Sequence, residues 1–267
     1  IGCATLMADG FITPAISISS AIEGLNVKMP NLPTIPIVIA IISGLFFIQK
    51  FGTESIGKYF GPVMIVWFTL IAGLGLRQIM IEPSVLVALS PYYAFTFLIS
   101  YPGAIWIMGA VFVCTTGAEA MYSDLGHIGK KNIRASWIYV IICLFLSYLG
   151  QGAFLLNTKA NHTSVFYSHV PDALLPYVIF IATLAAIIAS QALITGVFTL
   201  VSEAIKLKLW TNLAIKYPAT EKGQVYVPAI NTLLFVGCLL VVAIFKRSAD
   251  MEGAYGLAIS IDMLMTS

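Results

Sequence analysis

Long apolar stretches separated by short polar segments dominate the sequence. A helix needs about 20 consecutive apolar residues to cross the hydrocarbon core of a bilayer, which is about 30 Å thick. Runs of this kind predict about eight membrane-spanning helices, near residues 2–24, 34–49, 60–76, 104–124, 135–156, 173–205, 227–245 and 253–267. The pattern therefore predicts an all-α, polytopic membrane protein.

Two further segments depart from this pattern. Residues 83–101 are apolar and aromatic, but Pro83 and Pro91 interrupt them. Proline breaks a helix because it has no N–H to donate and its ring collides with the preceding turn. We therefore expect a pair of short helices in the outer membrane interface rather than a span. Residues 207–226 mix lysines with apolar residues and predict a cytoplasmic connector.

Composition supports a membrane protein. Hydrophobic residues make up 59% of the chain and charged residues only 10%, whereas about 25% of the residues in a soluble domain are charged. This composition excludes an ordinary soluble domain. The sequence starts without a methionine and ends inside an apolar run, so we expect residues 1–267 to be a fragment of a longer membrane protein.

The basic residues alternate between the two sets of loops, and this alternation predicts the orientation. Nine lie in one set: Lys50, Lys58, Lys130, Lys131, Arg134, Lys206, Lys208, Lys216 and Lys222. Five lie in the other: Lys28, Arg77, Lys159, Lys246 and Arg247. Because lysine and arginine accumulate in cytoplasmic loops, the residue 1 side is predicted to be cytoplasmic.

The first apolar segment carries an unusual polar face. With 3.6 residues per helical turn, its polar side chains all fall within an arc of about 120°: Asp9, Thr13, Ser17, Ser20 and Glu23. A charged carboxylate at the centre of a bilayer costs about 3 kcal/mol or more, so such groups face the protein interior or a water-filled cavity. This face predicts a pathway for cations.

The same segment contains Pro14, which cannot donate to the carbonyl of Gly10 and should kink the helix there. We expect that freed carbonyl to be a cation ligand beside the oxygens of Asp9, Thr13 and Ser17, which suit K⁺ or Na⁺. The alternative is that both hydroxyls bond back to their own helix while Asp9 pairs with a lysine or caps the helix end.

A second polar group closes the segment near 104–124. Two threonines and Gly117 at mid-membrane favour a local break in the helix, and broken helices commonly present ligands to ions in transporters. Thr116 and Glu119 are three residues apart and so share one side of a helix. In a partly dry site Glu119 could load and release a proton. The alternative is that Glu119 makes a structural bond between helices.

The last segment contains Tyr255 between small residues, where its hydroxyl could close an ion site from the side, or the ring could simply pack. Asp262 lies further along and is assigned no role. In the long segment 173–205 we expect the polar side chains to act as hydrogen-bonding links between helices: Ser190, Gln191 and Thr195.

Cysteines and histidines give no sign of a metal site or a disulfide framework. All four cysteines lie in apolar segments without metal-ligand spacing, and we expect them to pack as small apolar residues: Cys3, Cys114, Cys143 and Cys238. The three histidines fall in loops, where we expect ordinary solvated side chains: His127, His162 and His169.

Several motifs resemble the Kup/HAK/KT potassium uptake permeases. They are ADGFITPAISISSAIEGL (8–25), TTGAEAMYSDLGHIGKKNIRASW (115–137), YLGQGAFLL (148–156), IASQALITGVFTL (188–200), GQVYVPAIN (223–231) and AYGLAIS (254–260). Their order and spacing agree with the family across essentially the whole chain. The family is similar to the amino acid–polyamine–organocation superfamily, so the resemblance implies a LeuT-like core of two inverted repeats with broken helices, with the spans of this chain as helices three to ten. It also implies that residues 1–267 are a transmembrane transporter domain without its first helices and C-terminal region.

The resemblance implies proton-coupled K⁺ uptake across the cell membrane by alternating access. Carried over by motif, the K⁺ ligands would be Asp9, Thr13, Ser17, Thr116, Glu119 and Tyr255. The proton-coupling candidates would be Glu119, Glu23 and Asp9. Asp262 departs from the small or hydroxylated residue that the family often has there. We expect the lipid bilayer, K⁺ and H⁺ as partners, no cofactor, no transition metal and no nucleic acid, and leave a homodimer open.

Three other functions were weighed. An amino-acid permease of the same fold is disfavoured because buried carboxylates repel an anionic substrate group. A passive K⁺ channel would need the same oxygens, and only flux measurements separate it from a carrier. An intramembrane hydrolase would need paired aspartates or a Ser/His pair on facing helices; no histidine lies in a predicted span, so we do not expect an enzyme.

Overall fold

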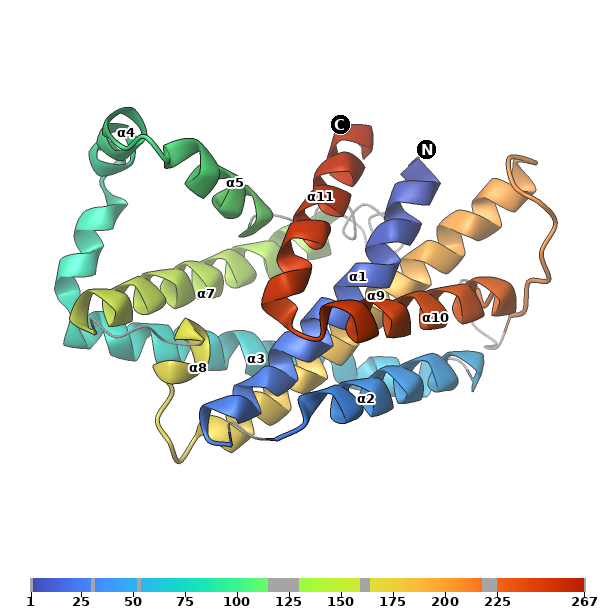
Figure 1. The fold of residues 1–267 in the computed structure, drawn as a ribbon, viewed down its shortest axis with the longest axis horizontal. Coiled ribbons are helices and arrows are strands. Elements are labelled where there is room, and N and C mark those ends of the chain that lie inside the picture. Colours follow the sequence, from blue (N-terminus) through green and yellow to red (C-terminus); the bar gives the residue numbers. More distant parts are fainter. Residues whose placement is uncertain are drawn as a thin grey trace. The chain divides into compact units, whose positions relative to one another are not determined.

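The computed structural model describes residues 2–29, 32–51, 54–114, 130–158, 164–217 and 225–266. In these residues the chain is helical apart from its connections and one isolated β-bridge between Lys216 and Tyr226. The elements, drawn in Figure 1, are α1 Gly2–Glu23, η1 Gly24–Val27, α2 Thr34–Ile48, η2 Gln49–Phe51, α3 Glu54–Ile81, η3 Pro83–Leu89, α4 Pro91–Ser100, α5 Ala104–Cys114, α7 Lys130–Asn157, α8 Val165–Ser168, α9 Leu175–Lys206, α10 Pro228–Phe245 and α11 Ser248–Thr266.

Each predicted apolar segment contains a helix, which confirms the all-α polytopic class. Among the residues that the structure describes, five helices are long and apolar enough to cross a membrane: α2 with η2, α3, α7, α9 and α10. Helices α1 and α11 match two more predicted spans, but polar residues such as Asp9 make them less apolar. The eighth predicted span, 104–124, is described only as far as Cys114.

The interrupted segment 83–101 forms two short helices, as its prolines predict. Pro83 and Pro91 each lie at the first position of a helix. A backbone N–H at that position has no acceptor within the helix, so proline costs no hydrogen bond there. The two helices, η3 and α4, meet at an angle of 76°. Counted as one broken span they raise the number of spans to six, and their place in the outer interface stays a prediction.

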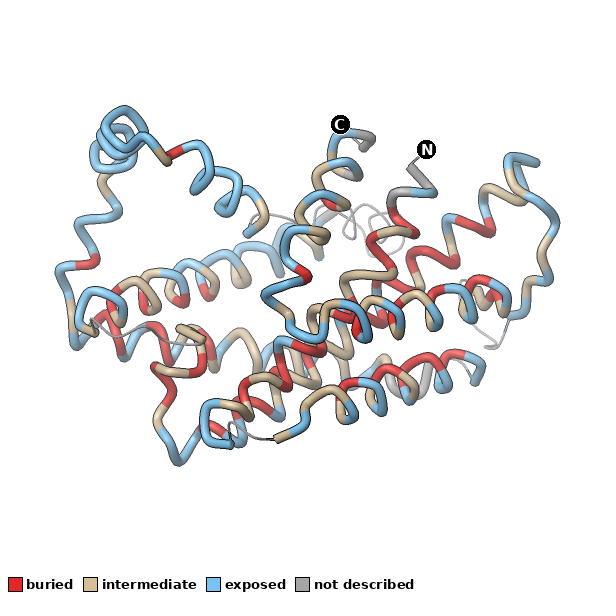
Figure 2. The backbone as a smooth tube through the Cα atoms, viewed as in Figure 1, coloured by how far each residue is buried: buried red, intermediate tan, exposed pale blue. Residues whose placement is uncertain are grey.

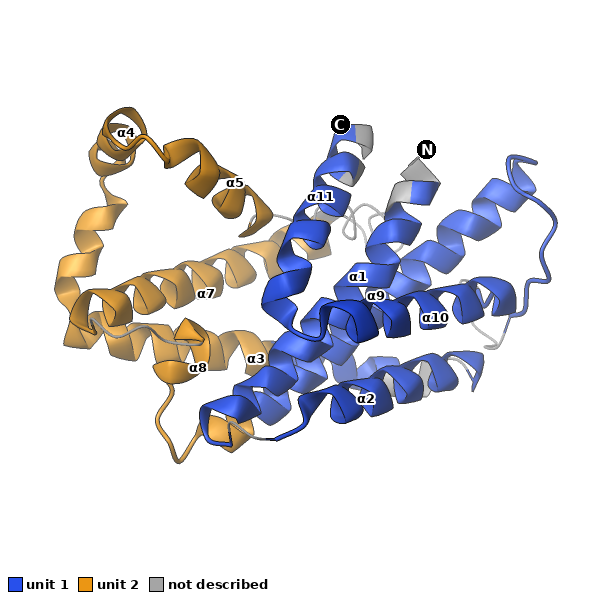
Figure 3. Cartoon of the chain, in the orientation of Figure 1, with its two compact units in different colours: residues 1–64, 118–128, 179–267 blue, residues 65–117, 129–178 orange. Residues whose placement is uncertain are grey.

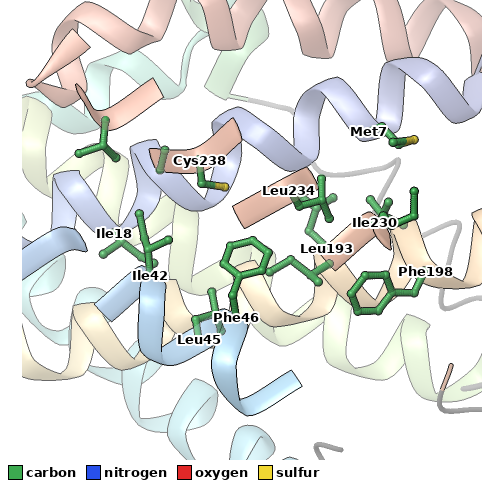
Figure 4. Packing of buried hydrophobic residues seen from close by; sticks show 14 of the residues in the cluster. Met7, Ile18, Ile42, Leu45, Phe46, Leu193, Phe198, Ile230, Leu234 and Cys238 are labelled. Atoms are coloured by element: carbon green, nitrogen blue, oxygen red, sulfur yellow. The ribbon is translucent and has the colours of Figure 1, made fainter. Parts of the chain in front are cut away.

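The chain divides into two compact units, shown in Figure 3. Unit 1 contains α1, α2, α10, α11 and most of α9. Helix α1 contacts α2, α10 and α11, and large aliphatic side chains from α1, α2, α9 and α10 fill the space between them. Ile18, Ile42 and Leu234 are completely buried there (Figure 4). Ile194 is completely buried as well.

Unit 2 contains most of α3, with η3, α4, α5, α7 and α8. Its helices α3 and α7 cross at two glycines. A Cβ on Gly150 would lie 2.3 Å from the Cα of Gly75, so no side chain fits between the two backbones. The buried core beside this crossing is small and consists of Ile79, Val85 and Ala153. Helices α4 and α5 are almost wholly exposed (Figure 2).

His169 is buried in unit 2, so the prediction of a solvated loop residue is wrong for it. Its side chain is 4% exposed and packs against the rings of Phe154 and Phe166. Its Nδ1 lies 3.1 Å from the carbonyl of Val165, and Gln78 on α3 donates to its backbone carbonyl. Burial lowers the pKa of this imidazole. His127 and His162 lie outside the described residues.

Candidate ion-binding site

Asp9 is the buried carboxylate of the predicted site. It lies on α1 inside unit 1, and only 2% of its surface is exposed. Thr13, one helical turn away, donates its hydroxyl to Oδ1 of Asp9 over 2.5 Å. The pair supplies two hard oxygens inside the protein.

The rest of the predicted polar face becomes less buried along α1. Thr13 and Ser17 are half-buried, and Ser20 is exposed. Burial of this face therefore decreases from Asp9, its most buried residue, towards Ser20. Asp9 and Thr13 lie four residues apart on α1, so the Thr13 hydroxyl bonds back to its own helix, as the alternative also expects. This bond therefore does not decide between an ion site and that alternative.

The carbonyl that Pro14 frees has a protein partner. The Sγ of Cys238 on α10 lies 3.6 Å from the carbonyl oxygen of Gly10, within reach of a weak S–H donor (Figure 4). Close packing brings α10 to this point, since a Cβ on Gly237 would meet the ring of Phe11 at 2.3 Å. The Gly10 carbonyl thus has a weak donor in the protein, and because a carbonyl oxygen has two lone pairs, its role as a cation ligand stays a prediction. Cys238 is more than a packing residue.

Glu23, at the other end of α1, is joined to the start of α11. Its Oε1 accepts the backbone N–H of Ser248 over 2.7 Å, and its Oε2 accepts the Ser248 hydroxyl. The sequence marked Glu23 as a proton-coupling candidate but gave no sign of this partner, which is 225 residues away in the sequence.

Tyr255 lies on α11, the helix that packs along α1. Helix α1 ends at the Glu23–Ser248 junction and α11 begins there, so the two chain directions are antiparallel and both helices extend to the same side of the junction (Figure 1). Ser17 precedes Glu23 by six residues and Tyr255 follows Ser248 by seven, so at about 1.5 Å per residue both lie about 10 Å from the junction. Tyr255, which is half-buried, is therefore level with Ser17.

Two of the predicted ligands, Thr116 and Glu119, lie outside the described residues. The structure thus places four of the six predicted ligands on two neighbouring helices of unit 1: Asp9, Thr13, Ser17 and Tyr255. Asp262 falls on α11 beyond Tyr255.

The polar residues of α9 divide into two kinds. Gln191 exchanges hydrogen bonds with Gln49 at the end of α2, which confirms its predicted role as a link between helices. Ser190 donates to the carbonyl of Ala186 in its own helix, and Thr195 does the same to Gln191. The prediction of links between helices is therefore wrong for these two hydroxyls. Short hydroxyl side chains reach their own backbone more readily than a neighbouring helix.

The described residues contain no group of three His, Cys, Asp or Glu side chains that could hold a metal ion. The predicted ligands are instead carboxylate and hydroxyl oxygens, with no more than one acidic residue at any one level of α1. Carboxylate and hydroxyl groups supply hard oxygen ligands.

Comparison with known proteins identifies the family. All of residues 1–267 match the family described as K⁺ potassium transporter, integral membrane domain. Proteins named probable potassium transport system protein Kup are 53% identical in Cytophaga hutchinsonii, 50% in Flavobacterium psychrophilum and 49% in Enterococcus faecalis. Each alignment covers 100% of this chain and 42% of the relative, so the chain spans less than half the length of these relatives.

No solved structure matches the chain. The family match over the whole chain and the identities near 50% are nevertheless enough to identify the family. This multi-pass membrane chain belongs to the Kup family of potassium transporters, which are not enzymes, and represents part of their integral membrane domain.

Proposed function

We propose that the chain is part of a transporter that takes up K⁺ across the cell membrane in symport with H⁺. The observation that carries this proposal is the buried Asp9 carboxylate with its Thr13 hydroxyl on the proline-containing helix α1. The relatives are named as potassium transport proteins, which supports the choice of ion. The side of residue 1 would be cytoplasmic.

The charge of the site favours a single monovalent cation. An ionised carboxylate taken out of water loses several kcal/mol of solvation, and a bound cation restores much of it. Hydroxyl oxygens from Thr13 and Ser17 then replace part of the hydration shell of the ion without adding charge. Tyr255 from α11, and Thr116 and Glu119, would complete the set.

Proton coupling would use carboxyl groups that change protonation during transport. Glu119, Asp9 and Glu23 are the candidates, and protonation of any one of them would weaken the hold on a cation by removing a negative charge. Moving one charge through 100 mV yields about 2.3 kcal/mol, so the membrane potential and an accompanying proton would together drive accumulation. Alternating access in a LeuT-like inverted-repeat core is the proposed route.

The same carboxylate argues against the amino-acid permease. An amino acid carries a carboxylate of its own, and two like charges in a partly dry site repel each other strongly. An experiment can distinguish a passive channel from a symporter, because a channel dissipates the K⁺ gradient whereas a symporter builds it.

The test is uptake of radioactive rubidium, which replaces K⁺, by the full-length protein in cells that lack other K⁺ uptake. Wild type should accumulate rubidium against its gradient, and a proton uncoupler should abolish the accumulation. Asp9→Asn should remove most of it, whereas the control Asp250→Asn, an exposed carboxylate on α11, should not. Accumulation by Asp9→Asn at the wild-type level would refute the site, and uncoupler-resistant flux down the gradient would indicate a channel.

A further inference from the structure

The ends of two distant helices meet at Glu23 and Ser248. Glu23 is the last residue of α1 and Ser248 is the first of α11. The carboxylate accepts two hydrogen bonds, from the backbone N–H and from the hydroxyl of Ser248. The first N–H groups of a helix have no partner within it and carry partial positive charge, so a carboxylate is well suited to this place.

The connection that leads into α11 is short and conformationally unusual. Only Lys246 and Arg247 separate the end of α10 from Ser248. Lys246 has a φ of 61°, in the left-handed region that residues with a Cβ rarely adopt. This turn changes the direction of the chain within two residues (Figure 1), so the direction of α11 depends on how its first residue is held. Glu23 is the side chain that holds it.

The two helices joined in this way carry the proposed ion ligands. Helix α1 contributes Asp9, Thr13 and Ser17, and α11 contributes Tyr255 at about the level of Ser17. A shift of α11 along α1 by one residue would move the Tyr255 hydroxyl by about 1.5 Å, which is enough to spoil coordination of an ion.

We propose that Glu23 is a positioning residue: its carboxylate caps α11 through Ser248 and thereby fixes Tyr255 beside the polar face of α1. This inference rests on the proposed function, because it concerns the geometry of that ion site. It differs from a role in which Glu23 itself carries the transported proton. If Glu23 carries the proton, transport depends on its carboxyl group alone. If Glu23 caps α11, transport also depends on Ser248, which donates to that carboxyl group.

The experiment compares rubidium uptake by four variants of the full-length protein: Glu23→Gln, Ser248→Ala, the double variant and Ser248→Thr. Ser248→Ala removes one charge-assisted hydrogen bond and should raise the apparent KM about fivefold while leaving Vmax within about twofold. Glu23→Gln should raise KM at least as much. The double variant should be no worse than Glu23→Gln, because the two side chains act through one contact. Ser248→Thr keeps the hydroxyl, so its KM should be close to that of the wild type.

Two further variants separate capping from proton transfer. Glu23→Asp keeps the charge but is shorter by one methylene group, so a capping role predicts impaired uptake and a proton-carrying role predicts activity. The control Glu252→Gln removes an exposed carboxylate on α11 and should leave KM unchanged. Wild-type KM in Ser248→Ala, or effects of Glu23→Gln and Ser248→Ala that multiply in the double variant, would overturn the proposal.

Melting temperatures of the same purified variants test the contact without relying on transport. If Glu23 caps α11, the losses of Glu23→Gln and Ser248→Ala should not add in the double variant. Additive losses would contradict the cap. A wild type that melts normally but takes up no rubidium would instead refute the proposed function, while the melting comparison would still decide the role of Glu23.

Discussion

The helices inside unit 1 and the helices inside unit 2 are packed by different kinds of contact. In unit 1, large aliphatic side chains such as Ile18, Ile194 and Leu234 fill the space between helices, and polar contacts join particular helix ends. In unit 2, the backbones of α3 and α7 touch at Gly75 and Gly150, beside a small buried cluster of Ile79, Val85 and Ala153. The proposed ion ligands that the structure describes all lie in unit 1, where side chains rather than backbone contacts set the spacing of helices.

This difference suggests a division of tasks. A backbone contact leaves no side chain that can change its rotamer, so the α3–α7 crossing should behave as a rigid element. Interlocking side chains and hydrogen bonds between helix ends can shift by small steps. Unit 1 is therefore the part in which we expect helices to respond to an ion. The following variants test the comparison, from the largest expected effect to the smallest.

Gly150→Ala should have the largest effect. The new Cβ would lie 2.3 Å from the Gly75 Cα, and because both contacts are backbone, α3 and α7 must move apart. We expect a loss of about 3 kcal/mol or more and little folded protein in the membrane. Gly73→Ala on α3 is the matched control, since nothing lies within 4 Å of its Cβ position, and it should be neutral or slightly stabilising. Equal melting temperatures for the two would show that unit 2 does not depend on the crossing.

Leu234→Ala tests the side-chain packing of unit 1. Leu234 is completely buried and lies near Gly10 on α1, so its truncation leaves a cavity that costs about 2–4 kcal/mol. Its neighbour Leu233 is 48% exposed, and Leu233→Ala should cost far less. The difference in melting temperature in detergent measures this contrast. If both substitutions lower the melting temperature equally, the core of unit 1 is not where the structure places it.

Cys238→Ala tests the partner of the freed carbonyl on α1. The S–H bond to Gly10 is weak, so its loss together with the sulfur should cost about 1 kcal/mol. Cys238→Ser keeps a donor at the same place and should be more stable than Cys238→Ala. If Cys238→Ala were the more stable variant, packing of the sulfur and not hydrogen bonding would be the contribution of Cys238 to stability.

His169 gives unit 2 a dependence on pH. Its pKa is lowered by burial, so the unfolded chain binds a proton more readily than the folded one. Stability should therefore fall as the pH drops below the ordinary value of 6.5 towards the lower folded-state pKa. Melting curves between pH 7.5 and 5.5 should show a decline in wild type that His169→Gln lacks. Parallel declines would assign the effect to other groups.

The helices and the bent pair could be predicted from the sequence because their causes are local. Apolar run length fixes α2, α7, α9 and α10, and Pro83 and Pro91 fix the break near residue 90. The polar face of α1 could likewise be predicted, since helical geometry alone places Asp9 and Thr13 together.

What the sequence could not predict depends on partners far along the chain. The sequence identifies Gly10 as a carbonyl without a helical donor, but not that Cys238 lies opposite it. Likewise, nothing near Glu23 points to Ser248. The burial of His169 depends on where the loop after α7 folds, and hydrophobic periodicity carries no information about that. Such an unmatched carbonyl or carboxylate is still a useful signal, because each buried polar group requires a partner.

The central claim is that Asp9 and Thr13 bind the transported ion, and direct binding tests it best. The melting temperature of the purified full-length protein should rise with K⁺ concentration, since a ligand that binds only the folded state stabilises it. The rise should vanish in Asp9→Asn, shrink in Thr13→Val and persist in Asp250→Asn. A K⁺-dependent rise of the same size in Asp9→Asn as in wild type would contradict the account.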